Sequence, residues 1–296
     1  MAAIEISMAK AWLSSIEDII GSRQSDIIKK ALVKYEDKSF PHKNWKKILL
    51  NLLNTDNSLE LWEQKFRFAN MNDARALLDE IYIDDVYGLR AIDKLEYVID
   101  AGASNGFFAF SVKKYFPDAI IDCIEPNENN IPLINENLAT YITSGDVRIT
   151  AKAIHNHEKG TSINIPNDVN IWGGLGANIP DRERTEERDL KKMQVDTITL
   201  SKFLNRKVSL LKCDIEGMEF EVIIEAGKLI KNCERLLIEI HSDVNNFTAK
   251  YTKLISFLHH NDFRVFCYEG ASSPASFFSG QPSPSFMMCA INNNFK

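Results

Sequence analysis

Four carboxylates follow one apolar run in the stretch SLLKCDIEGMEFEVI, and their spacing divides them into two pairs. Asp214 and Glu216 stand at the end of the predicted strand, where two acids of the same parity can face one site and accept a proton. We expect this pair to lack a cationic partner in the chain, so that a cationic ligand would offset the cost of burying it. Glu219 and Glu221 fall in the first turns of the next helix, where attraction to the helix N-terminus explains them.

A glycine turn forms a second candidate site in VIDAGASNGFF, where an apolar strand ends at Asp100 and leads into Gly102 and Gly106. Glycine lets the backbone approach a ligand closely or take a positive φ, and the amides of the following helix then face that ligand. The spacing lacks the lysine of a P-loop, and Ser104 replaces the middle glycine of the dinucleotide fingerprint. A carboxylate aimed at this turn would repel a pyrophosphate and favour a cationic amino-acid end.

The second apolar run closes with Glu125 in CIEPNENN, 23 residues after Gly102. A doubly wound sheet places an acid here to accept hydrogen bonds from ribose hydroxyls. The alternative is a carboxylate that only serves the N-terminus of the next helix, which Asn127 can cap. The acid together with the glycine turn favours a nucleoside site, and S-adenosylmethionine is a nucleoside that carries a cationic amino acid.

The segments VIDAGASNGFFAF, CIEPNENN and LLKCDIEGMEFEVI resemble, in order and spacing, the FkbM-type family of S-adenosylmethionine-dependent methyltransferases. The resemblance covers about residues 95–290, and the D-x-E-G-x-E stretch is its most specific part. It implies a seven-stranded methyltransferase sheet and O-methylation of a hydroxyl on a sugar, glycolipid, polyketide or related metabolite. The acceptor would be a small molecule or a glycan- or lipid-linked group.

The resemblance also implies a cofactor site, residue by residue. The turn would surround the methionine end, Glu125 would hold the ribose with Asn127 nearby, and Ala153 would flank the adenine. No Asp or Asn stands at 152–154 to pair with the adenine amino group. The expected cofactor-binding residues are Asp100, Gly102, Ala103, Ser104, Asn105, Gly106, Glu125, Asn127, Ala153 and Asp214.

Three residues are candidates for accepting or directing the acceptor's proton: Asp214, Glu216 and His241. His241 shares the parity of Glu239 in LLIEIHSD, so both are expected on one face near the end of a strand. The alternatives are that Glu216 only binds helix-start amides and that His241 is structural. We expect no metal, because the H-x-H pair at 155–157 is followed by no further ligand pattern.

The elements that position these residues alternate between strand and helix from about residue 95. This order predicts an α/β fold with a Rossmann-like seven-stranded methyltransferase sheet, mostly parallel with one antiparallel edge strand. Expected strands are 96–102, 119–126, 146–154, 208–214, 234–243, 263–269 and 285–292. Expected helices of this part are 105–116, 127–141, 218–230 and 247–260. The loop IWGGLGAN and the Gly-, Ser- and Pro-rich segment 269–284 are expected to shape the acceptor pocket, the second as a lid.

Residues 1–80 have helical periodicity only and are expected to form an N-terminal helical cap or oligomerisation region, with the methyltransferase domain at 81–296. The expected helices are 4–20, 25–36, 44–53 and 59–68, with breaks between them. We expect a homo-oligomer formed through these helices.

The composition of the chain limits the expected partners and location of the protein. The net charge of −6 gives no basic footprint, so nucleic acid is not an expected partner, and no apolar run reaches the roughly 18 residues of a membrane span. Five dispersed cysteines are typical of reduced thiols and predict a cytoplasmic protein. Two alternatives to an enzyme of this family stay open: a catalytically lapsed cofactor-binding domain that assembles partners, and, disfavoured by its glycine spacing, a nicotinamide oxidoreductase.

Overall fold

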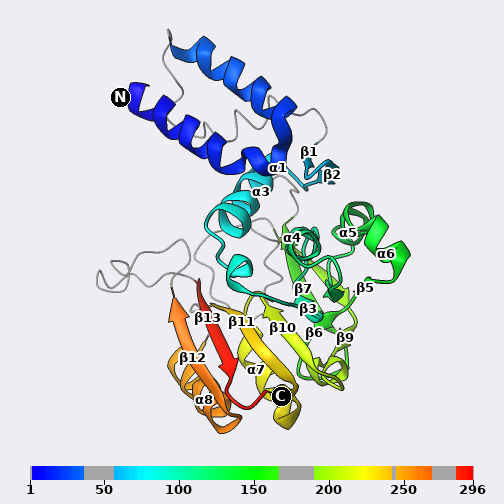
Figure 1. Cartoon of the computed structure of the whole chain (residues 1–296). Coiled ribbons are helices and arrows are strands. Elements are labelled where there is room, and N and C mark those ends of the chain that lie inside the picture. Colours follow the sequence, from blue (N-terminus) through cyan, green and yellow to red (C-terminus); the bar gives the residue numbers. More distant parts are fainter. Residues whose placement is uncertain (1, 37–56, 167–189, 242–244, 269–284, 296) are drawn as a thin grey trace. The chain divides into compact units, whose positions relative to one another are not determined.

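The computed structural model of the chain describes residues 2–36, 57–166, 190–241, 245–268 and 285–295. It divides into two compact units, Met1–Asp85 and Val86–Lys296, which we describe separately (Figure 1). The sequence-based division into 1–80 and 81–296 stays a prediction. The expected helix at 44–53, the loop at 171–178 and the candidate lid at 269–284 lie outside the described residues.

The first unit combines helices with a small hairpin. Its elements are α1 (Ala2–Glu36), β1 (Ser58–Leu61), β2 (Gln64–Arg67), α3 (Met71–Leu77) and the π-helix η1 (Leu78–Ile83). Trp12, 6% exposed, packs into this core and donates its indole N–H to Asp79 at 2.9 Å. Gln24 donates to the backbone oxygen of Glu60 at 2.6 Å, which ties α1 to the hairpin.

The predicted helix at 59–68 is wrong, because this segment forms the antiparallel hairpin β1–β2. Four apolar side chains alternate along it and are almost fully buried, as a strand period of two requires: Leu59, Leu61, Phe66 and Phe68. The two turn residues, Trp62 and Glu63, have φ of 48° and 63°. A tight hairpin turn with two positive φ values normally carries Asn-Gly or Asp-Gly, so the sequence lacks the usual turn signal.

Helix is assigned through the expected break at residues 21–22, but α1 is not straight. Glu17 accepts a hydrogen bond from Ser25 and pairs with Lys29, and the latter partners are 12 residues apart. In a straight helix that spacing spans about 18 Å. The chain therefore bends sharply between Glu17 and Ser25, where the sequence predicts an interruption.

In the second unit, the described strands form a seven-stranded sheet in the order β12-β13-β11-β10-β3-β4-β5 (Figure 1). Their bounds are β3 (Tyr97–Ala101), β4 (Ile120–Ile124), β5 (Val147–Thr150), β10 (Val208–Cys213), β11 (Cys233–His241), β12 (Phe263–Tyr268) and β13 (Ser285–Asn292). The order from β11 to β5 is parallel throughout, and β13 is antiparallel to both of its neighbours. The predicted mostly parallel sheet with one antiparallel strand is confirmed. The antiparallel strand is β13, which lies between the edge strand β12 and β11.

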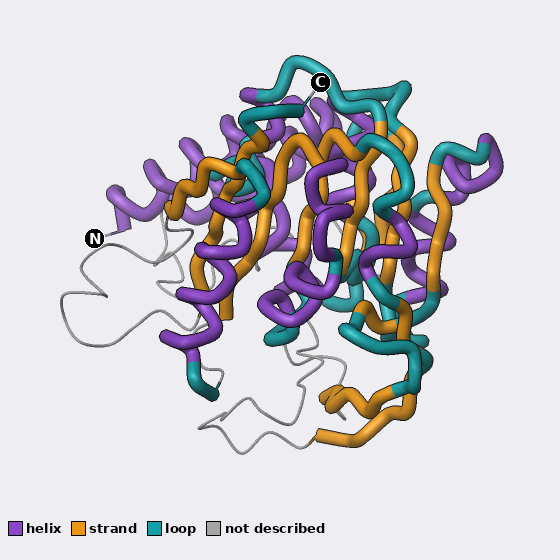
Figure 2. Tube along the Cα trace, turned by 90° about the horizontal axis from the view of Figure 1, so that it is seen from below, coloured by secondary structure: helices purple, strands orange, loops and turns teal. Residues whose placement is uncertain are grey.

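Helices lie on both faces of this sheet (Figure 2). They are α4 (Phe107–Tyr115), α5 (Ile131–Asn137), α6 (Ala139–Ser144), α7 (Glu219–Glu225), α8 (Phe247–His260), and the short 3-10 helices η2 (Leu89–Ala91), η3 (Leu200–Phe203) and η4 (Gly227–Asn232). On one face, α7 and α8 pack against Ile99, Leu211 and Ile238 in a single apolar core. The alternate residues of the same strands, Asp100, Lys212 and Glu239, therefore point to the other face.

Two short sheets extend the unit beyond β5. The expected third strand, 146–154, divides into β5 and β6 (Ala153–Ile154), and β6 pairs in parallel with β9 (Thr197–Ile198). Strands β7 (Thr161–Pro166) and β8 (Leu190–Val195) form an antiparallel pair that is absent from the expected strands. The pair is placed by contacts between distant residues, which local periodicity does not reveal.

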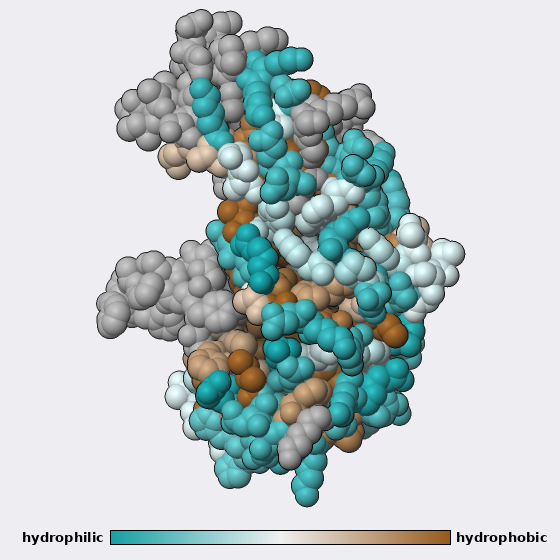
Figure 3. Space-filling model, viewed as in Figure 1, coloured by the Kyte–Doolittle hydropathy of each residue, from teal (hydrophilic) through white to brown (hydrophobic). Residues whose placement is uncertain are grey.

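None of the described helices is both long enough and apolar enough to cross a lipid bilayer. On the face of the second unit drawn in Figure 3, hydrophilic side chains predominate and apolar ones are scattered among them. Scattered apolar residues are normal on a folded surface.

Phe220 offers a test of this core, because it is 1% exposed and packs edge-on against Phe247. Replacing it by alanine should lower the free energy of unfolding by about 3–5 kcal/mol through lost transfer energy and a residual cavity. Phe266, 44% exposed, is the matched control, and its alanine variant should lose less than about 1 kcal/mol. Urea unfolding followed by circular dichroism measures both, and equal losses would contradict the assigned core.

Candidate active site

A cavity lies at the carboxyl ends of β3, β4 and β10, the edge at which parallel α/β sheets bind ligands. Predicted site residues that line it are Gly102, Ser104, Glu125, Ala153, Asp214 and Glu216. Asn130, His155 and Ile215 line it as well, although the sequence analysis gives them no role.

The glycine turn is shaped by the approach of two strand ends. Gly102 has a φ of 82°, and a Cβ at this position would stand 1.8 Å from the backbone oxygen of Asp214. Only glycine fits here, since no side chain can avoid that backbone atom. Ser104 and Gly106 also have positive φ, 52° and 85°, so the turn is left-handed at three positions. The sequence analysis expects this glycine to allow a close approach of the backbone or a positive φ. The structure shows both, and the atom that approaches is the backbone oxygen of Asp214.

The turn is joined to the end of β4 by hydrogen bonds from three successive backbone amides. Gly102 and Ala103 donate their amides to the backbone oxygen of Ile124, at 2.9 and 3.1 Å. Glu125 accepts the amide of Ser104 at 2.8 Å through Oε2. The expected cofactor edge is therefore one hydrogen-bonded unit built from the ends of β3 and β4.

Glu125 is 6% exposed, and its Oε1 accepts the amide of Asn127 at 2.8 Å and the side-chain amide of Asn130 at 3.3 Å. Burial raises the pKa of Glu125 to about 7, against the opposing effect of these hydrogen bonds. The sequence analysis gives two alternatives for Glu125, a ligand-binding acid and an acid that serves the next helix. In the structure the carboxylate binds backbone amides, and it also lines the cavity in which a ligand would lie.

Asn105 and Asn127 are both buried, at 4% and 2% exposure, and each caps its own turn. The Asn105 side-chain oxygen accepts the amide of Phe107 at 3.1 Å, and that of Asn127 accepts the amide of Asn129 at 3.0 Å. The Asn127 side-chain nitrogen has no hydrogen-bond partner within the described part of the chain. Neither residue lines the cavity, and both support the turns that border it.

The expectation that Asp214 and Glu216 lack a cationic partner is wrong for Asp214, because Lys212 lies between Asp214 and Asp100. Its ammonium is 3.3 Å from Asp100 and 3.5 Å from Asp214, and it donates to the backbone oxygen of Gly102 at 2.8 Å. Asp100 is fully buried and is the register partner of Lys212 across β3 and β10. Burial raises the pKa of Asp100, and Lys212 counteracts that rise. Asp100 thus touches the lysine within the sheet, and Asp214 is the member of this trio that lines the cavity.

Glu219 has a larger role than the helix-dipole interaction expected for it. It is fully buried, and its carboxylate accepts the amides of Ile215 at 3.2 Å and Gly217 at 3.0 Å. The same carboxylate lies 2.9 Å from Nδ1 of His241. Glu221, by contrast, pairs with Lys250 at 2.8 Å on the helix flank, where a modest surface contribution is the appropriate account.

His241 is 3% exposed and surrounded by acids. Its Nε2 lies 3.5 Å from Glu216 and 4.0 Å from Glu239. Burial lowers the pKa of His241, but Glu219, Glu216 and Glu239 together raise it to about 10. The imidazole is therefore a cation at neutral pH in the ligand-free protein, and in that state it orients carboxylates and accepts no proton.

His155 adds a ring to the cavity at the expected adenine position. It is 8% exposed and follows Ala153 and Ile154 of β6. Its ring contacts that of His157 at a tilt of 39°, with the centroids 3.9 Å apart. Its Nδ1 has no hydrogen-bond partner among the described residues. The H-x-H pattern is the signal that sequence reasoning used only to exclude a metal.

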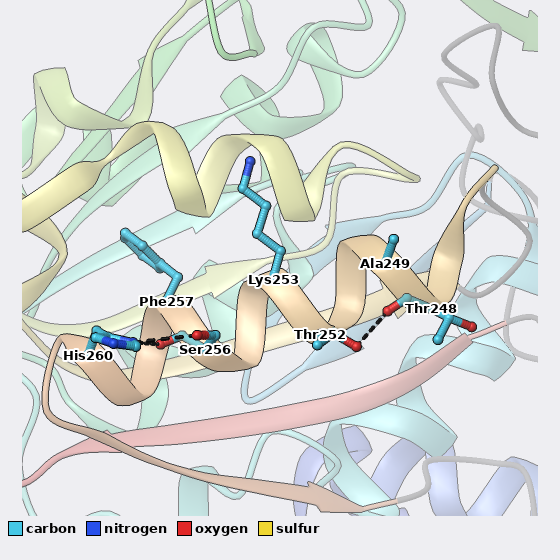
Figure 4. Close-up of a pocket in the computed structure, with 7 residues that line it drawn as sticks. All are labelled: Thr248, Ala249, Thr252, Lys253, Ser256, Phe257 and His260. Atoms are coloured by element: carbon cyan, nitrogen blue, oxygen red, sulfur yellow. Dashed lines mark hydrogen bonds between the residues drawn. The ribbon is translucent and has the colours of Figure 1, made fainter.

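A second depression runs along α8 and differs from this cavity in kind (Figure 4). Its lining side chains come from one helix: Thr248, Ala249, Thr252, Lys253, Ser256, Phe257 and His260. The hydrogen bonds drawn there are local ones within the helix, such as Thr252 to the backbone oxygen of Thr248 at 2.8 Å. Among the described residues, the side chains that line this depression all belong to α8, whereas several strands and loops contribute to the cavity at the strand ends. We therefore place the candidate active site at the strand ends.

Replacing Glu219 by alanine should lower the free energy of unfolding by about 3–5 kcal/mol, because two loop amides and His241 lose their buried partner. Glu221→Ala is the matched control from the same helix, and it should cost less than about 1 kcal/mol. Urea unfolding of both variants measures the difference. Similar stabilities would show that Glu219 does not hold this loop.

The raised pKa of Glu125 predicts that the free energy of unfolding depends on pH. Its pKa in the folded chain, about 7, exceeds the ordinary value of 4.5, so the folded state binds more protons between these values. Stability should therefore fall as the pH rises from 4.5 to 7, by up to about 3 kcal/mol from this group. Glu125→Gln should remove that part of the slope when urea unfolding is repeated across the range. An unchanged slope would contradict the assignment.

The chain is similar in sequence to fungal methyltransferases. It is 24% identical to Methyltransferase 1 of Beauveria bassiana over 197 residues, which covers 60% of this chain and 77% of that protein. It is 23% identical to Methyltransferase sdnD of Sordaria araneosa over 195 residues, covering 57% of this chain and 75% of that one.

Solved structures with a similar fold include a putative rRNA methylase of Clostridium thermocellum, at 10% identity and a TM-score of 0.45 over 72% of this chain and 95% of that one. Another is Precorrin-6y C5,15-methyltransferase of Geobacter metallireducens, at 12% identity and a TM-score of 0.40 over 71% and 88%. The match that decides the family is to the Methyltransferase FkbM domain, over residues 100–265. That span covers more than half of the chain and contains the glycine turn, Glu125, the D-x-E-G-x-E loop and His241. The chain belongs to the FkbM methyltransferase domain family.

Proposed function

We propose that this chain transfers a methyl group from S-adenosylmethionine to a hydroxyl oxygen of a sugar, glycolipid, polyketide or related metabolite. Membership of the methyltransferase family supports methyl transfer. The observation that carries the proposal is the cavity in which a glycine turn, a ribose-type acid and two further carboxylates meet at the strand ends. When bound, S-adenosylmethionine supplies a methyl group attached to a positively charged sulfur.

The residues present fit this cofactor. Glu125 offers carboxylate oxygens to ribose hydroxyls, and the unpartnered Nδ1 of His155 is a buried polar group on the cavity wall that a ligand can satisfy. The unpartnered side-chain nitrogen of Asn127 is buried two residues from Glu125. Gly102 leaves no side chain between the turn and the cavity. Asp214 presents a negative charge on the same wall, which favours a cationic ligand over a pyrophosphate.

Methyl transfer to a hydroxyl requires alignment of the acceptor oxygen and a place for its proton. Asp214 and Glu216 both line the cavity, and either carboxylate can take that proton. His241 is buried next to Glu216, with its Nε2 3.5 Å from that carboxylate, and helps to orient it. The expected cytoplasmic location, the exclusion of nucleic acid as a partner and oligomerisation through the N-terminal helices remain predictions from composition and sequence pattern.

Calorimetry with S-adenosylhomocysteine tests the cofactor site directly. Glu125→Gln should weaken binding at least tenfold, because hydrogen bonds to a charged carboxylate are lost. Glu128→Gln is the matched control, since Glu128 is an exposed acid three residues away. Equal affinity of the two variants would contradict the assigned ribose site.

Transfer of a tritiated methyl group from S-adenosylmethionine into a panel of hydroxylated sugars, lipids and polyketides tests the reaction. We expect label in an alkali-stable ether product. Tight cofactor binding without transfer to any hydroxyl would favour the alternative of a catalytically lapsed binding domain.

A further inference from the structure

We propose that Asp214, Glu216 and His241 bind a divalent transition-metal ion, such as Mn²⁺, at the acceptor side of the cavity. One ligand atom from each residue lies within 4.8 Å of the other two. Two carboxylate oxygens and one imidazole nitrogen form a donor set suited to Mn²⁺, Fe²⁺ or Zn²⁺. The proposal goes beyond the function stated above, which needs no ion, and it replaces the sequence-based expectation of no metal.

His241 is arranged as a metal-binding histidine is. Its Nδ1 lies 2.9 Å from the Glu219 carboxylate and can donate to it. An ion that displaces the proton from Nε2 would therefore meet the lone pair of Nε2, while Nδ1 keeps its proton and its bond to Glu219. Nε2 lies 3.5 Å from a carboxylate oxygen of Glu216 and 4.0 Å from one of Glu239. A carboxylate that fixes the second ring nitrogen is the usual support of a metal-ligating histidine.

Glu219 also holds the segment that carries the other two ligands. It binds the amides of Ile215 and Gly217, which flank Glu216, and so fixes the backbone between the two acids. The three ligands come from the end of β10, the following turn and the end of β11, so they converge from separate elements. Lys212 lies 3.5 Å from Oδ2 of Asp214 and supports that carboxylate from the sheet.

The position of this cluster carries a consequence for the acceptor, and this step rests on the proposed function. Asp214 and Glu216 line the cavity, so an ion held by them would keep open coordination positions toward it. An acceptor with two adjacent oxygens, such as a vicinal diol or a hydroxy ketone, can occupy two such positions at once. We therefore assign chelating hydroxyl compounds as the favoured acceptor class.

Manganese titration of the full chain, freed of metal with EDTA, tests the site without cofactor or acceptor. Electron paramagnetic resonance of unbound Mn²⁺ should show one bound ion per chain. Glu216→Gln should weaken binding at least tenfold, and Glu219→Gln about 10–100-fold through the orientation of His241. Glu221→Gln is the matched control, because it removes the same charge from the same helix and should bind Mn²⁺ as the wild type does.

Absence of Mn²⁺ binding to the wild type, or equal affinities of Glu216→Gln and Glu221→Gln, would overturn the proposal. Circular dichroism establishes that each variant is folded, and Glu216→Gln is the safest probe because Glu216 retains 22% exposure. S-adenosylhomocysteine calorimetry on the same samples separates the two hypotheses. Intact cofactor binding without Mn²⁺ binding defeats only the ion, and Mn²⁺ binding without cofactor binding defeats only the proposed function.

Discussion

One buried carboxylate organises the loop after β10 and the end of β11. Glu219 is fully buried and accepts hydrogen bonds from two backbone amides of the loop after β10. Its carboxylate also lies 2.9 Å from Nδ1 of His241 at the end of β11. A buried charge is stable only when its hydrogen-bonding capacity is filled, so the loop and His241 must take the positions that fill it. The placement of Glu216 follows, since it lies between the two amides that Glu219 holds.

The features that local sequence determines are those that the sequence predicts well. Strands β3, β4, β10 and β11 are mainly apolar runs with few charged residues, which is the pattern of a parallel sheet covered on both faces. The glycine turn and Glu125 follow from what a strand-to-helix turn and a strand end can do chemically. The structure brings Gly102, Glu125 and Asp214 to one cavity, as expected from strands whose carboxyl ends meet at one edge.

The features that depend on partners across the sheet are those that sequence reasoning missed. Lys212 stands two residues from Asp214, yet its role becomes visible only when the β3–β10 register places it opposite Asp100. Glu219 has the sequence signature of an ordinary first-turn acid, and only its burial beside His241 reveals more. The hairpin at Trp62 and Glu63 lacks the glycine or asparagine that normally announces a turn of this geometry.

The backbone contact between residue 102 and Asp214 gives a rule for comparing members of this family. A Cβ at 102 would lie 1.8 Å from a carbonyl oxygen, a distance that no rotamer change can relieve. In a relative that carries any other residue at this position, the chain after the strand that corresponds to β10 must follow a different path. Its acids in that loop would then occupy other positions, and site assignments made for this chain could not be transferred to it by alignment alone.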